Sequence, residues 1–430
     1  MVQRQARYET RFTMDTSSIK FGPGATREVG ADMARLGGRR VMVVTDARLT
    51  DGETVTVTMD ALRGERIDAV LYDEVRVEPT DGTFMAAAAF ASEGAFDGYV
   101  AVGGGSVMDT AKAANLYATY PAPLLTYVNP PIGEGKPVPG PLKPLIAIPT
   151  TAGTGSETTG VAIFDYETLH AKTGIAHRAL RPTLGIIDPD NTLTMPPMVA
   201  ACSALDVLSH AVESFTALPY HSRTAPDHPG QRPTYQGANP ISDIWAAKAM
   251  DVMARNIARV VDDSSDDEAR GEMLLAAAYA GIGFGNAGVH LPHGMSYPVS
   301  GMVRDYVPPG YPNDHPIVPH GMSVILNAPA VFRWTARANP ERHLEAARLL
   351  GAETGGAAME DAGEVLASQI ERIMHRVGMP NGLSGVGLGP DDVDVLVAGT
   401  LPQHRVTKLS PRPAGESDLR ELFLAAMRYW

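Results

Sequence analysis

The chain has 430 residues, enough for two or more domains with a large core. Its formal net charge of −13 argues against general affinity for nucleic acid or anionic membranes. There is no run of about 18 apolar residues, so no membrane-spanning helix is expected. The single cysteine, Cys202, excludes an intrachain disulfide framework, and residues 1–12 lack the apolar core of a signal peptide. We therefore expect a cytoplasmic protein, or a mitochondrial-matrix protein if the source is eukaryotic.

The first half of the chain alternates strand and helix signals. Short β-branched or apolar runs predict strands at Ser18–Phe21, Arg40–Thr45, Ala69–Tyr72, Gly98–Val102 and Leu145–Ile148. Helical spacing of apolar residues predicts helices at Ala25–Leu36, Val55–Leu62, Gly82–Ser92 and Val107–Tyr117. Strands that alternate with helices predict a mostly parallel, Rossmann-like sheet covered on both faces.

The pattern changes near Pro189–Pro197, and almost all later signals are helical. The predicted helices are Val199–Ala217, Ile241–Val261, Glu268–Gly283, Met322–Arg337, Pro340–Leu350, Met359–Val377, Asp391–Ala398 and Ser417–Met427. Leu218–Pro240 and Pro298–Pro319 are predicted to be irregular inserts. The predicted fold is an α/β N-terminal domain over residues 1–190, followed by an all-α C-terminal domain over residues 191–430.

A glycine-rich turn between a strand and a helix predicts a phosphate-binding loop. The segment Val100–Lys112 reads VAVGGGSVMDTAK, and its three glycines allow a ligand to approach the backbone closely. The first amides of the following helix then favour an anion such as a pyrophosphate. The loop is neither GxGxxG nor a P-loop, and a tight turn without a ligand is the alternative.

Two other segments are compatible with a dinucleotide. Asp46 ends a predicted strand, where a carboxylate can accept hydrogen bonds from ribose hydroxyls or can simply cap a turn. Thr150–Glu157, TTAGTGSE, follows a buried strand with small and hydroxyl side chains. This segment can wrap a ribose or nicotinamide, or can be an ordinary turn.

Asp206 and His210 lie four residues apart in a predicted helix, so both side chains share one face. The pair can bind a metal or form a hydrogen bond. His290, His293 and His320 lie among glycines, prolines and apolar residues. One carboxylate and three imidazoles would make a four-residue site for a divalent first-row metal.

These motifs together resemble the iron-containing alcohol dehydrogenase family. The matching segments are GGGSVMDTAK, PTTAGTGSE, the DxxxH of Asp206 and His210, HGMSYPVSG and PHGM, in that order. The resemblance implies a nucleotide-binding α/β domain and a helical domain, with Asp206, His210, His293 and His320 as metal ligands. The implied cofactor-binding residues are Asp46, Gly103, Gly104, Gly105, Ser106, Asp109, Thr150, Thr151, Thr154 and Lys172.

The sequence departs from the family pattern at one position. Family members commonly have a second histidine four residues after the third ligand, and this chain has Tyr297 there. We expect Tyr297 or His290 to handle protons in its place.

A narrower resemblance, to the hydroxyacid–oxoacid transhydrogenase branch, covers most of the chain. It is carried by the segments LPYHSRTAPDHPGQRPTYQGANPISDIWA, KTGIAHRALRPTLGIIDP and GFGNAGVHLPHGMSYPVSG. It implies interconversion of a hydroxyacid such as 4-hydroxybutyrate and its aldehyde, with 2-oxoglutarate as hydride acceptor. Arg178, Arg181 and Arg223 are the predicted carboxylate-binding residues, since arginine suits bidentate carboxylate binding.

The expected cofactors are Fe²⁺, with Zn²⁺ as the alternative, and NAD rather than NADP, because Asp46 would repel a 2′-phosphate. A homo-oligomer is expected. The alternative functions are a conventional NAD(P)-dependent alcohol dehydrogenase and a metal-dependent lyase on a dehydroquinate-synthase-like scaffold. A nucleotide-binding or interaction protein without catalysis is a third alternative.

Overall fold

The computed structural model describes residues 8–169, 171–311 and 315–430, which form two compact units. The sheet unit comprises Thr16–Ala200 and Asp263–Gly281, and the helical unit comprises residues 8–15, Ala201–Asp262 and Ile282–Trp430. Each unit is therefore built from separate segments of the chain. The sequence analysis, in contrast, predicted two continuous domains that meet at residue 190.

Six parallel strands form the main sheet of the sheet unit. Their order is β1-β8-β5-β4-β2-β3, and every neighbouring pair is parallel. The strands are β1 Ser18–Phe21, β2 Arg40–Val44, β3 Asp68–Tyr72, β4 Gly98–Gly103, β5 Leu145–Pro149 and β8 Leu184–Ile187. A parallel sheet is buried on both faces, and therefore its central strands read as continuous apolar runs.

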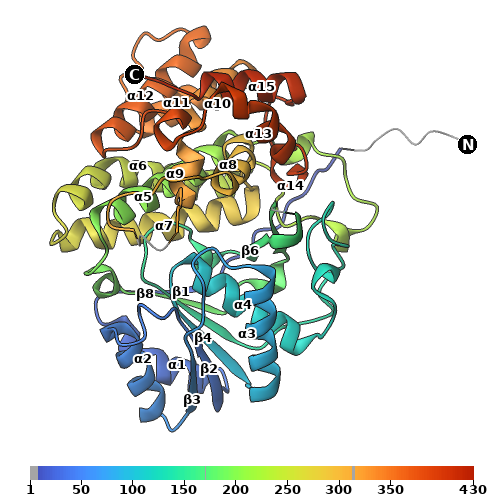
Figure 1. Cartoon of the computed structure of the whole chain (residues 1–430), viewed down its shortest axis with the longest axis vertical. Helices are drawn as coiled ribbons and strands as arrows, with labels where there is room; N and C mark the ends of the chain where they lie inside the picture. The colour runs from blue at the N-terminus through green and yellow to red at the C-terminus, as the bar shows by residue number, and fades with distance from the viewer. Residues whose placement is uncertain (1–7, 170, 312–314) are drawn as a thin grey trace, which may run out of the picture. The chain divides into compact units, whose positions relative to one another are not determined.

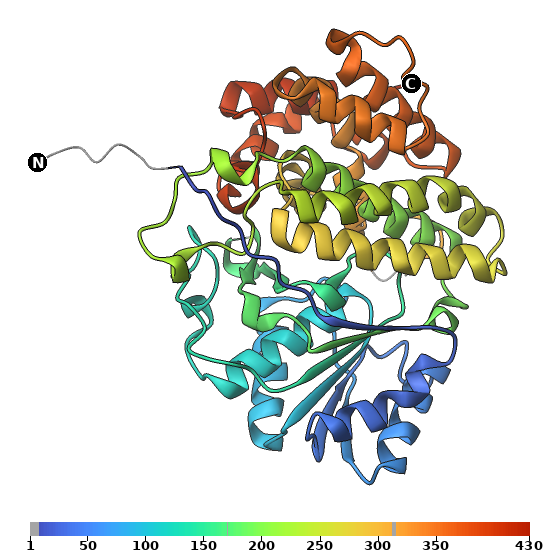
Figure 2. The same ribbon diagram turned by 180° about the vertical axis from the view of Figure 1, so that it is seen from behind.

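Alternate side chains of each strand pack against different helices. Met42 and Ala101 join the core formed with α3 (Asp81–Gly94) and α4 (Gly105–Thr119). Val43 and Val100 join the core formed with α1 (Val29–Arg35) and α2 (Glu53–Gly64). Figures 1 and 2 show the darker blue α1 and α2 on one face of the sheet and the lighter blue α3 and α4 on the other.

The predicted fold class is confirmed, and all five predicted strands are present to within about one residue at each end. Three strands were not predicted. β8 completes the sheet between β1 and β5, and β6 (Val161–Tyr166) pairs antiparallel with β7 (Ala171–Ala176). These short strands lie in a segment where glycine, proline and polar residues obscure the alternation of apolar positions.

Helices build the helical unit. They include α6 Pro240–Asp262, α8 Leu291–Gly301, α9 His320–Ile325, α10 Ala328–Thr335, α11 Pro340–Leu349, α12 Ala362–Arg376, α13 Val393–Thr400, α14 His404–Thr407 and α15 Glu416–Ala425. Two further helices, α5 (Pro197–Thr216) and α7 (Asp267–Ala287), contain residues of both units.

Two helical predictions need correction. The single helix predicted at Met322–Arg337 is two helices, α9 and α10, and the break falls two residues before Pro329, which lacks an amide hydrogen. The insert predicted to begin at Pro298 is still helical there, because α8 continues through that proline to Gly301. Both differences lie where proline makes the sequence signal ambiguous.

One property of α5 was also not expected. By length and composition alone it is apolar enough to cross a membrane, and so is the pair α7 and α8 if counted as one bent span. However, 83% of the most apolar window of α5 is buried within the protein. This burial is what a core helix requires.

Candidate metal centre

Helix α5 provides the first two residues of the site. Asp206 and His210 are one turn apart on it, and His210 Nε2 lies 3.7 Å from Asp206 Oδ1. Both side chains are almost fully buried, at 4% and 5% exposed. The predicted placement on one helical face is therefore confirmed.

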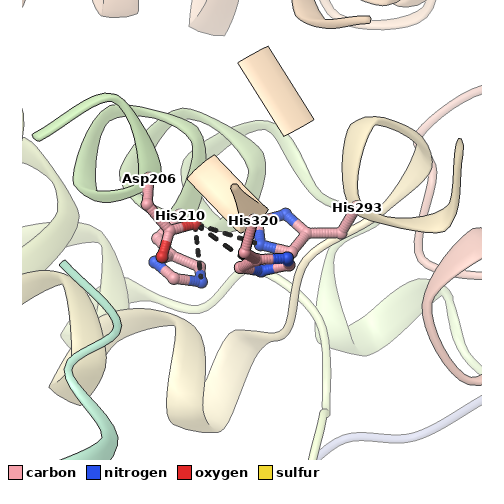
Figure 3. Close-up of side chains that lie close together, drawn as sticks. All are labelled: Asp206, His210, His293 and His320. Atoms are coloured by element: carbon pink, nitrogen blue, oxygen red, sulfur yellow. Dashed lines mark ion pairs between the residues drawn. The ribbon is translucent and has the colours of Figure 1, made fainter. Parts of the chain in front are cut away.

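Helices α8 and α9 add two imidazoles to this pair. His293 Nε2 lies 3.7 Å and His320 Nε2 lies 3.8 Å from the same oxygen, Asp206 Oδ1. The four ligand atoms all lie within 4.8 Å of one another. Figure 3 shows the four side chains pointing toward one another from three separate helices.

A glycine follows each of these two histidines and allows the helices to pack closely. A Cβ on Gly321 would lie 2.0 Å from the Cys202 carbonyl oxygen of α5. A Cβ on Gly294 would lie 2.6 Å from Thr407 Cγ2 of α14. The shared Pro-His-Gly-Met pattern therefore has a physical reason, since each motif pairs a ligand with a close backbone approach.

The donor set fits a metal ion. Asp206 Oδ1 and His293 Nε2 are buried and make no hydrogen bond, and their separation of 3.7 Å is too long for one. Buried polar atoms are otherwise almost always paired, so a shared cation would satisfy both. Three imidazole nitrogens and one carboxylate oxygen suit a divalent first-row metal. His320 is 34% exposed and is the most accessible of the four side chains.

The electrostatics of the four groups also favour a cation. Burial lowers the pKa of His210 to about 3, so its ring is neutral. Burial would raise the pKa of Asp206, but the imidazoles of His210 and His320 hold it below its usual range. For His293 burial alone would lower the pKa, but the neighbouring carboxylates of Glu213 and Asp206 raise it to about 10. The two carboxylates therefore favour a positive charge at this group, which a metal ion bound in place of a proton would supply.

Glu213, which the sequence analysis did not identify, positions His293. Its Oε1 lies 2.6 Å from His293 Nδ1, and its Oε2 accepts a hydrogen bond of 2.5 Å from the amide of His290. Glu213 belongs to α5 and is fully buried. Its carboxylate lies at the start of α8, where the first amides of that helix stabilise a negative charge. It fixes the His293 tautomer that leaves Nε2 free for a metal. The sequence shows only that Glu213 lies seven residues after Asp206, on the same face of α5, and this spacing does not reveal its contact with α8.

The two proton-transfer candidates have different surroundings. The Tyr297 hydroxyl accepts a hydrogen bond of 2.8 Å from Arg405 Nη2. His290 is completely buried, and its Nε2 lies 3.1 Å from Thr216 Oγ1. Burial lowers the pKa of His290 to about 4, which makes its ring neutral. The role of each residue stays a prediction.

The predicted dinucleotide loops lie side by side in the sheet unit. The Thr150 amide donates to the Gly103 carbonyl over 3.2 Å. A Cβ on Gly104 would lie 3.3 Å from Thr151 Oγ1, and one on Gly105 would lie 2.7 Å from Thr154 Cγ2. Gly104 is the N-cap of α4, so the unpaired first amides of this helix lie in the same loop cluster.

The remaining residues of this cluster hold the loops together. Asp109 accepts from Ser156 Oγ and from the Ile163 amide, so both of its oxygens serve the protein itself. Ser106 Oγ accepts from the Glu78 amide. Lys172 Nζ lies 3.4 Å from both Glu78 and Asp165.

Asp46 follows β2 at the same edge of the sheet. Thr45, just before it, donates to the carbonyl of Val102 in β4. One carboxylate oxygen of Asp46 accepts from the Arg48 amide and caps the turn. One oxygen of Asp46 therefore has the turn-capping role, and the binding of ribose hydroxyls by this carboxylate stays a prediction.

The three predicted carboxylate-binding arginines lie in both units. Arg178 and Arg181 belong to the sheet unit, and Arg181 Nε donates to the Thr158 carbonyl. Arg223 belongs to the helical unit, where burial lowers its pKa and Glu9 opposes that effect. Their substrate role stays a prediction.

Sequence comparison decides the family. Residues 16–189 match the family model described as iron-containing alcohol dehydrogenase, and residues 234–427 match its C-terminal model. The chain belongs to the iron-containing alcohol dehydrogenase family. Members of this family are oxidoreductases that bind a metal and NAD(H). Membership therefore favours an oxidoreductase over the lyase alternative.

Similar family members have a more specific name. "Hydroxyacid-oxoacid transhydrogenase, mitochondrial" of Mus musculus is 56% identical over 421 residues, covering 97% of this chain and 90% of that protein. The Homo sapiens protein of the same name gives the same identity and coverage. The resemblance found in the sequence is therefore confirmed.

Solved structures show the same fold. A 1,3-propanediol oxidoreductase superposes with a TM-score of 0.85 at 28% identity, covering 97% of this chain and all of that one. An alcohol dehydrogenase from Oenococcus oeni gives a TM-score of 0.84 at 26% identity, with the same coverage.

Glu213→Gln should weaken metal binding without unfolding the protein. The amide keeps the size of the side chain but removes the negative charge that holds the His293 proton on Nδ1. We expect the dissociation constant for Fe²⁺ or Zn²⁺ to rise about 10- to 100-fold, as measured by competition with a chelator. Glu345→Gln, on the exposed face of α11, is the matched control. Equal affinities in the two variants would contradict the positioning role.

Proposed function

We propose that this enzyme is a hydroxyacid–oxoacid transhydrogenase. The observation that supports it most is the buried convergence of Asp206, His210, His293 and His320 in a chain 56% identical to proteins of that name. Hydride would leave the carbinol carbon of a hydroxyacid such as 4-hydroxybutyrate and reach the keto carbon of 2-oxoglutarate. A proton would pass from the first substrate's hydroxyl to the second substrate's oxygen. The products would be succinate semialdehyde and 2-hydroxyglutarate.

The residues would divide the work between the two units. In the helical unit, the four-residue group would hold a divalent ion, which supplies Lewis-acid polarisation of the substrate oxygen when bound. In the sheet unit, the loops around Gly103–Gly105 and Thr150–Thr154 would bind NAD, which carries hydride between the substrates. Tyr297 or His290 would exchange the substrate proton. A homo-oligomer and a cytoplasmic or mitochondrial-matrix location stay predictions, and the names of the relatives place those proteins in mitochondria.

Iron is the proposed metal, since the family is named for it and the donor set is rich in imidazole nitrogen. Elemental analysis of protein purified without oxygen should find about one iron per chain, as expected for one four-residue site. His293→Ala should contain almost none, and His375→Ala, an exposed histidine of α12, should retain it. Stoichiometric zinc in the wild type would replace iron in this proposal.

The transhydrogenase reaction can be separated from ordinary dehydrogenation. Purified wild type, given 4-hydroxybutyrate and 2-oxoglutarate without added NAD, should form succinate semialdehyde and 2-hydroxyglutarate in equal amounts over many turnovers. This is expected because bound dinucleotide is regenerated in each cycle. Chromatography of both products is the measurement, with His293→Ala as the inactive control. Product that appears only in proportion to added NAD would identify a conventional dehydrogenase.

Asp46 should determine the preference for NAD over NADP. In Asp46→Ser, loss of the carboxylate removes its repulsion of a 2′-phosphate, and the ratio of the NADP and NAD dissociation constants should fall about tenfold. Fluorescence titration with the reduced dinucleotides measures this ratio. Asp51→Ser, exposed in the same turn, is the control and should keep the wild-type ratio. An unchanged ratio in Asp46→Ser would leave only the turn-capping role.

A further inference from the structure

Arg405 lies beside the helix that carries His293. Its short helix, α14, packs against α8 where Gly294 leaves room for Thr407. From there Arg405 Nη2 donates a hydrogen bond of 2.8 Å to the Tyr297 hydroxyl. The guanidinium carbon lies 5.3 Å from the centroid of the Tyr235 ring. Two tyrosines therefore fix the orientation of this guanidinium.

Within the described part of the chain, the charge of Arg405 has no carboxylate partner. Its charge interacts with Tyr297 and Tyr235 rather than with an Asp or Glu, and its Nη1 is buried without a hydrogen bond. Arg270 and Arg342 also have a buried nitrogen without a hydrogen bond, but Asp267 and Asp243 neutralise them. Because an unpaired buried charge is costly, a guanidinium held in this way is suited to an anion supplied from outside the chain.

Two sets of contacts connect Arg405 with the metal ligands. Arg405 contacts Tyr297, which lies four residues after His293 on α8, a rise of about 6 Å along the helix axis. On the other side, the Tyr235 ring that Arg405 faces lies 6.4 Å from the Phe284 ring, centroid to centroid. The Phe284 ring in turn stacks on His210 at a centroid distance of 3.8 Å. All of these residues belong to the helical unit.

We propose that Arg405 binds the carboxylate of the substrates, with Tyr297 orienting its guanidinium. This proposal rests on the proposed function and names the residue that selects acids over neutral alcohols. Arginine presents two parallel N–H groups to a carboxylate, and Nη1 is the group still to be paired. Arg178, Arg181 and Arg223 are then not required for this contact.

The geometry also explains how one site can serve two substrates. In 4-hydroxybutyrate, the carbinol carbon and the carboxylate carbon are separated by three bonds. In 2-oxoglutarate, the keto carbon and the distal carboxylate carbon are separated by the same number of bonds. An arginine that pairs with either carboxylate would therefore hold both reacting carbons at the same distance from itself, so each substrate could take the place of the other.

The test compares an acid with its neutral isostere. The ratio of kcat/KM for 4-hydroxybutyrate to that for 4-hydroxybutyramide should fall about 100-fold in Arg405→Met, because only the acid has a charge to pair. Arg405→Lys should recover part of the ratio, since it restores the charge without the bidentate fork. Arg412→Met is the matched control, because Arg412 also stacks on an aromatic ring, that of Trp334 at 3.9 Å. A structural role for Arg405 would lower both rates together and leave the ratio unchanged, which would overturn the proposal.

Direct binding separates this proposal from the proposed function. Butyrate, titrated calorimetrically into the metal-loaded enzyme, should bind the wild type and Arg412→Met, and should bind Arg405→Met at least about tenfold more weakly. If the wild type binds butyrate through Arg405 but oxidises no hydroxyacid, the carboxylate site stands and the proposed reaction fails. If butyrate binds wild type and Arg405→Met equally, or binds neither, the assignment of Arg405 is overturned.

Discussion

The arrangement of the candidate metal centre depends on the Glu213 carboxylate, which lies at the start of α8. It accepts from the backbone of His290 and faces the His293 ring, so one side chain of α5 fixes both the position of α8 and the tautomer of a ligand. The first amides of a helix have no partners within it, which makes this an electrostatically favourable place for a buried carboxylate. Tyr297, one turn further along α8, takes its position from the same contact.

The four candidate ligand side chains leave buried polar atoms without hydrogen-bond partners. Asp206 Oδ1 and His293 Nε2 are buried without hydrogen bonds, and three imidazoles lie around one carboxylate oxygen. Such an arrangement persists only because the surrounding packing determines it, including the two glycines that admit α5 and α14. The rule that buried polar atoms form hydrogen bonds is therefore broken at these four side chains, while the parallel sheet follows the expected pattern of buried apolar strands.

The sequence predicted five of the six strands of the main sheet, because buried parallel strands appear as uninterrupted apolar runs such as Val41–Val44. The pairing of Asp206 and His210 could also be predicted from the sequence, since their spacing alone places them on one helical face. The family resemblance then identified His293 and His320 as their partners. Local patterns did not predict α8 or α14 as helices. Both are short, and α8 contains an internal proline.

Glu213 and Arg405 were missed for a different reason. An acidic residue on a helix and an arginine near the C-terminus are both ordinary in sequence, and their surroundings come from residues far away in the chain. His293 is 80 residues from Glu213, and Tyr297 is 108 residues from Arg405. Only the tertiary fold shows that the first is buried at a helix start and that the second has no counter-ion among the described residues.

The close packing around Gly321 and Gly294 has a consequence for the life of the enzyme. The ligand side chains are held by protein contacts: Glu213 fixes His293, and the backbone of α5 fixes the start of α9 beside His320. Their arrangement therefore does not depend on the ion to fold it, in contrast to small zinc domains that are unfolded without metal. A metal ion lost by chelation would therefore be replaceable in a finished scaffold, and supply of the ion alone would restore the loaded site.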